Sequence, residues 1–504
     1  MIYEAWRLAP VTLRADLVVI GAGPGGATAA MVAAEAGLRV VILEAGEYLT
    51  PVDMSQREEQ MLPRLFWDAG NRVNTARTVR IHQGRGVGGS SLHNLNLCKR
   101  IPDAIRLMWA RDRGVEIPWS ALYDEVEALI GVSDVPVDRV NRHNRILADG
   151  AAALGWKNGP LRHNRSGCVG SGFCELGCAF DAKNNAMKVC IPRAVAAGAE
   201  VMALCQAVRL SVADGRVNGV DAVALDPLTR RPVGTVRVEA PRVCLSASAT
   251  STATLLQRSG VPDPGGETGE RLRVHPAVVV AGDYADPVHA WLGIPQTWEC
   301  TEHLELEREG DPAAHRTWIV PAFAHPAGTA TMAPGFGADH HAFMSRYAHL
   351  AVLTAMIHDL TAGSVRPRGE LGMSLTYDPI PEDRRELSLG LWASAKLLFA
   401  GGALRVLVPG RRARVLTRPE EVEGLRDLDP IDEGMELTAV HPMGSVPMGA
   451  DPRVAAVGID GAHHHVDGLW IADGSLFPGS IGVPPQLSIY AMGLHVGRAL
   501  VAGG

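Results

Sequence analysis

The order of apolar and polar positions predicts a strand–helix–strand unit at the start of the chain. Short apolar runs at 17–20 and 40–43 are typical of buried strands, and the alanine-rich segment between them predicts a helix that ends near Gly37. Two alternating segments, 199–210 and 217–225, predict a hairpin that turns at Asp214 and Gly215. A strand from Val243 leads into another helix. Strands that alternate with helices in this way predict a parallel, Rossmann-type sheet.

The middle of the chain follows a different pattern. Residues 50–74 are polar and predict a helical excursion from the first sheet, and 118–132 predicts a helix on the substrate side. From 279 to 415 the sequence is rich in Pro, Gly and His, with alternating segments at 370–377 and 385–391. We expect a large antiparallel sheet here, with covering helices. One of these is expected at 392–399, before Gly401 and Gly402, and a last helix at 485–500.

Size and charge restrict the class of protein. The chain has 504 residues, too many for one ordinary core, so two domains are expected. Its net charge of −7 disfavours nucleic acid or an anionic membrane as a partner. No run of about 18 apolar residues occurs and the N-terminus lacks the pattern of a signal peptide, so we expect no membrane span and a cytoplasmic location. Eight cysteines in this length fit reduced thiols.

The turn after the first strand carries the pattern GxGxxG, and an acid follows at the tip of the second strand. Glycines allow a tight turn and let the backbone approach a pyrophosphate, which the unpaired N–H groups at the helix start would hold. The acid would accept the ribose hydroxyls. The pattern predicts a dinucleotide site but does not separate FAD from NAD. Its expected cofactor contacts are Gly21, Gly23, Pro24, Gly26 and Glu44.

A second glycine cluster, HQGRGVGGSSLHN at 82–94, predicts an extended loop. It resembles the second signature of the glucose–methanol–choline (GMC) oxidoreductases, the FAD-dependent alcohol oxidases and dehydrogenases, and is especially similar to cholesterol oxidases of that family. The resemblance implies FAD rather than NAD, with the loop along the pyrophosphate and the isoalloxazine. The residues that it assigns to the cofactor are Gly84, Arg85, Gly88, Gly89, Ser90, His93 and Asn94.

The resemblance continues to the C-terminus. Residues 168–185 are similar to a segment of long-chain alcohol oxidases and cholesterol oxidases, and 469–483 to the family's flavin-ring strand and turn. In the segment that follows Val243, Ser248 stands in place of the family's usual glycine and Ala253 in place of its proline. The start of the last helix is expected to face the flavin. The further cofactor residues that the resemblance implies are Val208, Asp473, Gly474, Pro484, Pro485 and Gln486.

Clusters of cysteine and histidine invite a metal assignment that their spacing does not favour. Cys168, Cys174 and Cys178 follow C-x5-C-x3-C, which lacks the paired spacing of structural zinc, although Cys190 leaves a four-cysteine iron–sulfur set open. The histidine run 463–465 is expected in a turn before a strand. We therefore predict buried or packing thiols and no metal site.

Alcohol oxidation needs a base for the hydroxyl proton while hydride leaves carbon for the flavin, and imidazole suits that role. The chain has 18 histidines, and His441 matches the family motif H-x-x-G-T…M-G, so the resemblance implies His441 as the catalytic base. Pro484 is the main departure, because the family has Asn or His there as a second hydrogen-bonding group. A proline side chain can neither donate nor accept a hydrogen bond.

These features predict an FAD-dependent oxidoreductase that oxidises a hydroxyl group of a largely apolar substrate, such as a sterol or a long-chain alcohol. The electron acceptor stays open between oxygen, a quinone and another carrier. Pro484 motivates an alternative, a flavoprotein of the same fold with a non-oxidative isomerase or lyase step, and a non-enzymatic flavin scaffold is a third possibility. We expect the FAD-binding domain at 1–120, 186–280 and 440–504, interleaved with a substrate domain at 121–185 and 281–439.

His93 leaves open how the flavin is held. In the choline-oxidase-like branch of the family, a histidine at this point of the loop is bonded covalently to the flavin. Cholesterol-oxidase-like members have an apolar residue there instead. A covalent bond and a noncovalent contact are both compatible with His93, because sequence does not show how the imidazole is oriented.

Overall fold

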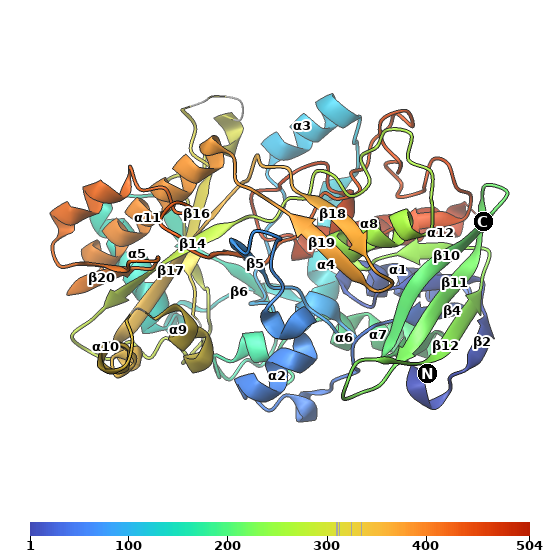
Figure 1. Ribbon diagram of the computed structural model, residues 1–504, viewed down its shortest axis with the longest axis horizontal. Helices are drawn as coiled ribbons and strands as arrows, with labels where there is room; N and C mark the ends of the chain where they lie inside the picture. Colours follow the sequence, from blue (N-terminus) through green and yellow to red (C-terminus); the bar gives the residue numbers. More distant parts are fainter. Residues whose placement is uncertain (309–310, 312, 324, 334, 504) are drawn as a thin grey trace.

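The computed structural model describes residues 1–308, 311, 313–323, 325–333 and 335–503. Both chain ends lie at the same end of the molecule, beside a six-stranded sheet (Figure 1). Every neighbouring pair in this sheet runs parallel. In sheet order its strands are β1 Ile2–Glu4, β9 Glu200–Ala203, β4 Val40–Leu43, β3 Leu17–Ile20, β13 Val243–Leu245 and β23 Leu469–Ile471. The Rossmann-type sheet is thereby confirmed.

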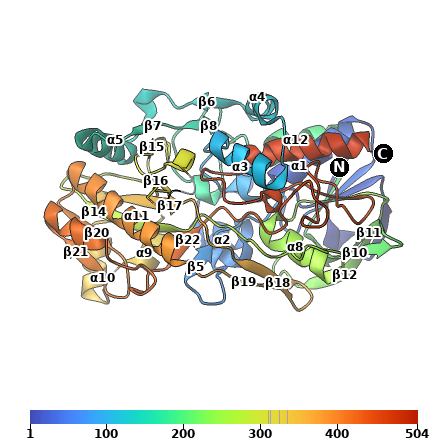
Figure 2. The same ribbon diagram turned by 90° about the horizontal axis from the view of Figure 1, so that it is seen from above.

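Helices and a second sheet complete this part of the molecule. Helix α1 packs against α12, the last helix of the chain (Figure 2). A four-stranded sheet includes the predicted hairpin, which turns at Asp214 and Gly215, both with positive φ. The helices here are α1 Pro24–Glu35, α6 Ala186–Val189, α7 Ile191–Ala196, α8 Ser248–Arg258 and α12 Gln486–Ala502. The strands of the second sheet are β10 Cys205–Ala213, β11 Arg216–Leu225, β12 Pro232–Glu239 and β2 Val11–Arg14.

Glycine brings α12 into contact with α1. A Cβ on Gly493 would lie 2.4 Å from the carbonyl oxygen of Gly25, so no side chain fits between the two helices there. We expect Gly493→Ala to lower the free energy of unfolding by roughly 1–3 kcal/mol through overpacking. Thermal melting of the purified protein measures this, with Gly424→Ala as the control because no atom lies within 4 Å of its added Cβ. Equal melting temperatures for the two variants would contradict the expectation.

The second large element is a nine-stranded sheet, which is antiparallel apart from one pair of strands. Helix α11 Pro381–Ala400 covers one face of it together with α5 Arg142–Leu154. The predicted large antiparallel sheet with covering helices is therefore confirmed. Its strands are β21 Arg414–Leu416, β20 Arg405–Val408, β14 Ala277–Asp283, β17 Leu350–Ile357, β16 Thr317–Pro321, β15 Trp298–Cys300, β7 Asn158–Pro160, β22 Leu437–Ala439 and β5 Val79–Ile81.

The expected strand-like alternation at 385–391 is wrong, because these residues form the middle of α11. Leucines there alternate with Ser388 and Gly390, which looks like a strand with one polar face. Both small residues are in fact buried: a Cβ on Gly390 would lie 2.7 Å from the Cβ of Ala355 in the sheet. A helix that is buried on most sides has no simple polar face, so its period is hidden. The helix ends at Ala400, before Gly401, as predicted.

The predicted helix at 118–132 exists as α4 Trp119–Ile130, but it does not lie on the substrate side. Its Tyr123 hydroxyl is 2.9 Å from the Ser488 hydroxyl, so α4 packs against α12 beside the parallel sheet. In the other direction, β5 falls within the range expected for the FAD-binding domain yet pairs with β22 of the nine-stranded sheet. The FAD-binding and substrate domains are therefore interleaved more finely than their expected boundaries describe. Those domain boundaries stay a prediction.

The remaining elements lie around and between the sheets. Residues 50–74 contain a short helix as expected, and the segment 370–377 supplies one strand of a hairpin. Within the described ranges, no helix is long and apolar enough to cross a membrane, and no group of three His, Cys, Asp or Glu is placed to hold a metal ion. These elements are α2 Glu58–Leu65, α3 Asp103–Arg113, α9 Pro326–Met332, α10 Ala338–Met344, β18 Ser364–Arg368, β19 Gly372–Thr376, β6 Val132–Asp134 and β8 Arg162–Asn164.

Buried histidines make the stability of the fold sensitive to acid. Burial lowers the pKa of His143 to about 4 and that of His275 to about 3, below the value near 6.5 in the unfolded chain. Below pH 6.5 the unfolded state therefore takes up protons that the folded state does not, and stability is lost as the pH falls. At pH 5 each of these two groups should remove about 1–2 kcal/mol. We expect a lower melting temperature at pH 5 than at pH 7, and a rise would contradict this.

Candidate active site

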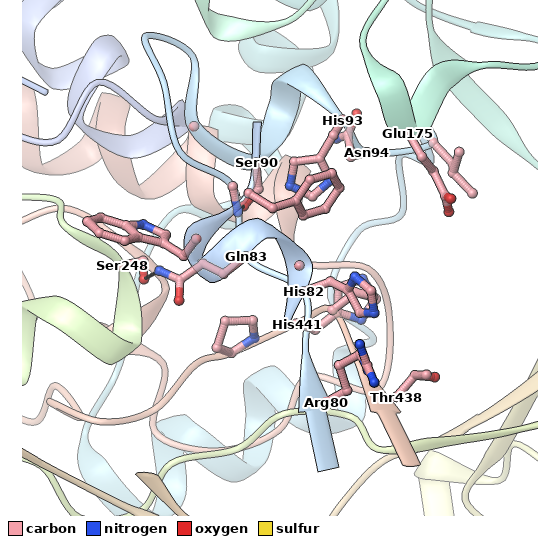
Figure 3. A pocket seen from close by; sticks show the side chains of 18 of the residues that line it. Arg80, His82, Gln83, Ser90, His93, Asn94, Glu175, Ser248, Thr438 and His441 are labelled. Atoms are coloured by element: carbon pink, nitrogen blue, oxygen red, sulfur yellow. Dashed lines mark hydrogen bonds between the residues drawn. The ribbon is translucent and has the colours of Figure 1, made fainter. Parts of the chain in front are cut away.

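One cavity of about 720 Å³ connects the parallel sheet to the nine-stranded sheet. Residues of the first glycine motif line it, and so do His441 and Pro484. Figure 3 shows His82, His93, Glu175 and His441 with their side chains around this space. The motifs that the sequence singled out far apart along the chain therefore meet at one site.

The two glycine loops touch each other at the cavity wall. A Cβ on Gly89 would lie 2.8 Å from the Cα of Gly23, and the Gly88 N–H donates to the Ala22 carbonyl at 2.9 Å. Gly21 and Gly89 both have positive φ, which side chains rarely adopt. The result is a cradle of bare backbone beside the first turn of α1, whose N–H groups have no partner within the helix. This arrangement fits a pyrophosphate.

Glu44 connects the loops beneath this cradle. Its buried carboxylate accepts the backbone N–H groups of Ala22 at 3.0 Å, Gly46 at 2.8 Å and Gly86 at 3.1 Å. Burial raises the pKa of Glu44, and the three N–H groups oppose that effect. A carboxylate has about four acceptor positions, so these N–H groups leave one unused, and Glu44 lines the cavity. Glu44 therefore has a structural role in addition to the ribose contact that the sequence predicts.

Strand pairing explains how His441 reaches the second glycine loop. In the parallel pair β5 and β22, Ile81 lies opposite Ala439, and the His82 N–H donates to the Ala439 carbonyl at 2.8 Å. The chain then continues into the glycine loop from one strand and to His441 from the other. Strand β14, which begins just after His275, pairs with β22 on its other side. His82 and His441 thus come just after β5 and β22, and His275 comes just before β14. Because these strands are neighbours, the three histidines lie close together.

His441 is half-buried at the cavity wall and contacts a second histidine. Its Nδ1 lies 3.1 Å from Nδ1 of His275, with the two rings nearly perpendicular. Nε2 of His275 in turn accepts the N–H of Gly482 at 3.1 Å. Burial holds the pKa of His441 well below its usual value, and His275 lowers it further. His441 is therefore neutral at physiological pH.

The start of α12 closes the cavity on the other side. Pro484, Pro485 and Gln486 all line the space, and the Asn94 side-chain amide donates to Gln486 Oε1 at 2.6 Å. This bond ties the end of the second glycine loop to the helix start. The first turn of α12 thus faces the cavity with its positive dipole end, which suits a flavin that gains negative charge.

Asp473 holds Ser248, the residue that stands in place of the family's usual glycine. Ser248 has φ +73, and its N–H donates to Asp473 Oδ2 at 2.9 Å while its hydroxyl bonds to Gln83. Asp473 also accepts from Thr252 Oγ1 at 2.6 Å, and burial raises its pKa. A serine in a left-handed conformation is held here by side-chain bonds that link β23, α8 and the second glycine loop.

Most of the predicted site residues line the cavity, and a few support it from behind. Gly26 packs α1 onto its own turn, and Gly88 bonds to the first loop. Arg85 lies 4.6 Å from the centre of the Trp67 ring, and burial lowers its pKa to about 10. Val208 is half-buried outside the lining, although Ala207 lines it. The predicted residues that line the cavity are Gly21, Gly23, Pro24, Glu44, Gly84, Gly89, Ser90, His93, Asn94, Asp473, Gly474, Pro484, Pro485, Gln486 and His441.

Sequence reasoning missed His275 and the role of Lys183. The buried Lys183 ammonium donates to the carbonyls of Leu92, Asn94 and Cys174 at 3.0, 2.5 and 2.9 Å, so it fixes the end of the second glycine loop. Burial lowers its pKa to about 8. A repeated His-Pro dipeptide was the available signal for His275, since the same dipeptide occurs at His441.

The surroundings of His93 favour noncovalent flavin. Its ring packs 4.0 Å from the Phe66 ring, centre to centre, and its Nε2 is buried without a hydrogen-bond partner in the described part of the chain. Because protein atoms enclose Nε2, we expect it to form no bond to the flavin. We expect acid precipitation of the protein to release intact FAD into the supernatant. Yellow colour that stays with the denatured pellet would contradict this expectation.

Comparison with known proteins decides the family. A family model for the N-terminal part of GMC oxidoreductases matches residues 22–277, and one for their C-terminal part matches 359–493. Together these ranges include well over half of the chain. The chain belongs to the GMC oxidoreductase family.

Curated GMC relatives cover almost the whole chain. An uncharacterised GMC-type oxidoreductase of Mycobacterium tuberculosis is 35% identical over 98% of this chain and 77% of its own length. A long-chain-alcohol oxidase of Arabidopsis thaliana is 27% identical over 97% of this chain and 67% of its own. A cholesterol oxidase of M. tuberculosis is 27% identical over only 37% of this chain and 38% of its own. The resemblance inferred from the motifs is confirmed.

Two solved structures share the architecture of this chain. Pyridoxine 4-oxidase from Mesorbium loti superposes with a TM-score of 0.72 at 20% identity, covering 96% of this chain and 98% of its own. Formate oxidase superposes with a TM-score of 0.73 at 16% identity, covering 98% and 99%. This GMC enzyme is an FAD-dependent oxidoreductase, and its glycine cradle, Glu44 and the start of α12 fit that cofactor.

Proposed function

We propose that this enzyme oxidises the hydroxyl group of a largely apolar substrate, such as a sterol or a long-chain alcohol, with His441 as the base. The wall of the cavity carries the proposal. Along β17, Leu350, Val352, Thr354 and Met356 line the cavity, whereas the residues between them pack under α11. Trp318 adds to the same wall from β16. This apolar part of the lining suits an apolar ligand beside the cofactor.

Three ionisable side chains of the wall, Arg80, Glu436 and Glu175, offer little net charge to a substrate. Arg80 and Glu436 pair with each other, Nε to Oε1 at 2.6 Å and Nη2 to Oε2 at 3.0 Å. Burial raises the pKa of Glu175 to about 7, so this carboxyl is only partly ionised at neutral pH. An uncharged alcohol fits these surroundings better than a sugar or an ionic substrate, which would need bonds for several polar groups.

In this proposal the apolar wall binds the substrate and His441 accepts its proton. When bound, FAD supplies the acceptor for the hydride. The apolar wall excludes water, and His441, whose Nδ1 contacts His275, would accept the hydroxyl proton at its other ring nitrogen, Nε2. Pro484 adds no side-chain hydrogen bond, so His441 works without the second partner that the family provides.

The names of two relatives support this substrate class, since one is called a long-chain-alcohol oxidase and the other a cholesterol oxidase. The electron acceptor, whether oxygen, a quinone or another carrier, and the cytoplasmic location stay predictions. The non-oxidative alternative rests on Pro484 alone.

An anaerobic screen tests the substrate class. The purified yellow enzyme is mixed without oxygen with 1-dodecanol, cholesterol, benzyl alcohol or glucose, and the visible flavin absorbance is followed. We expect bleaching with an apolar alcohol and none with glucose. Bleaching by glucose alone would exclude the proposed class, and no bleaching with any alcohol would favour the non-oxidative alternative.

A further inference from the structure

The hydrogen bonds behind His441 have a fixed direction. A backbone N–H can only donate, so Nε2 of His275 must accept the Gly482 N–H at 3.1 Å with its lone pair. A neutral imidazole carries one hydrogen, which in His275 therefore lies on Nδ1. That nitrogen is 3.1 Å from Nδ1 of His441, so it donates there. His441 then accepts at Nδ1 and carries its own hydrogen on Nε2.

We infer that His275 is a positioning residue, through which Gly482 keeps the hydrogen of resting His441 on Nε2. The resting enzyme then offers the Nε2–H of His441 as a hydrogen-bond donor to a ligand oxygen. This inference rests on the proposed role of His441 at the substrate oxygen and adds a condition to it. His441 can act as a base at Nε2 only in its other neutral form, in which Nδ1 carries the hydrogen.

The other form requires a bond to break. If Nδ1 of His441 carries the hydrogen, Nδ1 of His275 must accept it, and the hydrogen of His275 moves to Nε2. That N–H would then point at the Gly482 N–H across 3.1 Å, so two donors would face each other. Leaving a buried group unpaired lowers the population of a state by roughly tenfold to a hundredfold. The base therefore becomes available when Gly482 releases His275.

The surroundings hold His275 in place and keep it neutral. Its φ is +51, and its N–H lies 3.4 Å from Asp359 Oδ1. Asp359 also accepts the Val274 N–H at 3.0 Å and the Tyr377 hydroxyl at 2.8 Å. Burial lowers the pKa of His275 to about 3, and His358 lowers it further. A strained backbone held by a carboxylate is the kind of feature found where a side chain must be placed accurately.

The first test reads the hydrogens directly. Neutron diffraction from deuterium-exchanged crystals of the FAD-bound enzyme, without substrate, locates deuterium on each ring nitrogen. We expect it on Nε2 of His441 and on Nδ1 of His275. Deuterium on Nδ1 of His441, alone or with Nε2, would overturn the inference. Because no substrate is present, this result is independent of whether any alcohol bleaches the flavin.

The second test removes the fixed direction. Asn tolerates a left-handed φ, and its amide can donate to His441 or accept from it, so His275→Asn releases the constraint. We expect the affinity of the holoenzyme for 2-decanone, followed by the flavin spectrum, to fall by about twofold, because an amide that donates and accepts equally well leaves roughly half of His441 with its hydrogen on Nε2. The affinity for decane, which has no oxygen, should not change. Tyr377→Phe is the control, since it alters a neighbouring bond to Asp359 only. Equal 2-decanone affinity in His275→Asn and the wild type would overturn the inference.

Discussion

Replacing His441 by alanine is expected to slow flavin reduction by the best alcohol substrate by at least roughly a hundredfold, as for the loss of a general base. The imidazole lines the cavity, and Pro484, which also lines it, has no side-chain group that could take over the contact to the substrate oxygen. Anaerobic stopped-flow measurement of flavin bleaching gives the rate directly.

The control is His464→Ala, which removes an exposed histidine bonded to the Gly449 carbonyl, away from the cavity. It should reduce flavin at the wild-type rate. Flavin content should be normal in both variants, because His441 makes no bond to the glycine loops. Near-full turnover by the His441 variant would remove this residue from the proposed role.

Glu44→Ala is expected to give protein that is purified without flavin. The substitution leaves three buried N–H groups, of Ala22, Gly46 and Gly86, without their acceptor. An unpaired buried donor is unfavourable by about 1–3 kcal/mol, so the two glycine loops should separate and the FAD affinity should fall by more than a hundredfold. The ratio of flavin to protein absorbance, before and after incubation with added FAD, measures this.

The matched control is Glu35→Ala, which removes an acid from the same strand–helix–strand unit. Glu35 pairs with Arg193 at the surface, 2.8 Å from Nε to Oε1, and an exposed pair of this kind contributes little. The control should stay yellow. A Glu44 variant with a normal flavin ratio would show that the carboxylate does not hold the loops together.

The sequence was sufficient to predict those elements whose structure depends on residues close together in the chain. The βαβ unit, its glycine turn and Glu44 lie within 31 residues, and the motif matches placed the second loop and His441 at the same cofactor. Helix α12 was also predictable, because its apolar residues recur with helical spacing after two prolines. Local signals of this kind do not depend on which parts of the chain meet later.

The missed features arise from contacts between distant segments. His275 reaches His441 only because β14 and β5 pair with opposite sides of β22, and no local pattern specifies that order. The middle of α11 looked like a strand because Gly390 lets the helix lie directly on the sheet, so small residues are buried where a polar face is expected. Helix α4 was misplaced for the same reason, since its apolar stripe does not say which neighbour covers it.

The ratio of carbonyl product to reduced flavin tests whether the enzyme oxidises a hydroxyl group. The oxidised enzyme is mixed anaerobically with one equivalent of the apolar alcohol that bleaches it best, and both reduced flavin and carbonyl product are quantified. Oxidation of a hydroxyl group predicts one aldehyde or ketone for each flavin reduced. Conversion of the alcohol while the flavin stays oxidised would exclude hydroxyl oxidation and would identify a redox-neutral reaction.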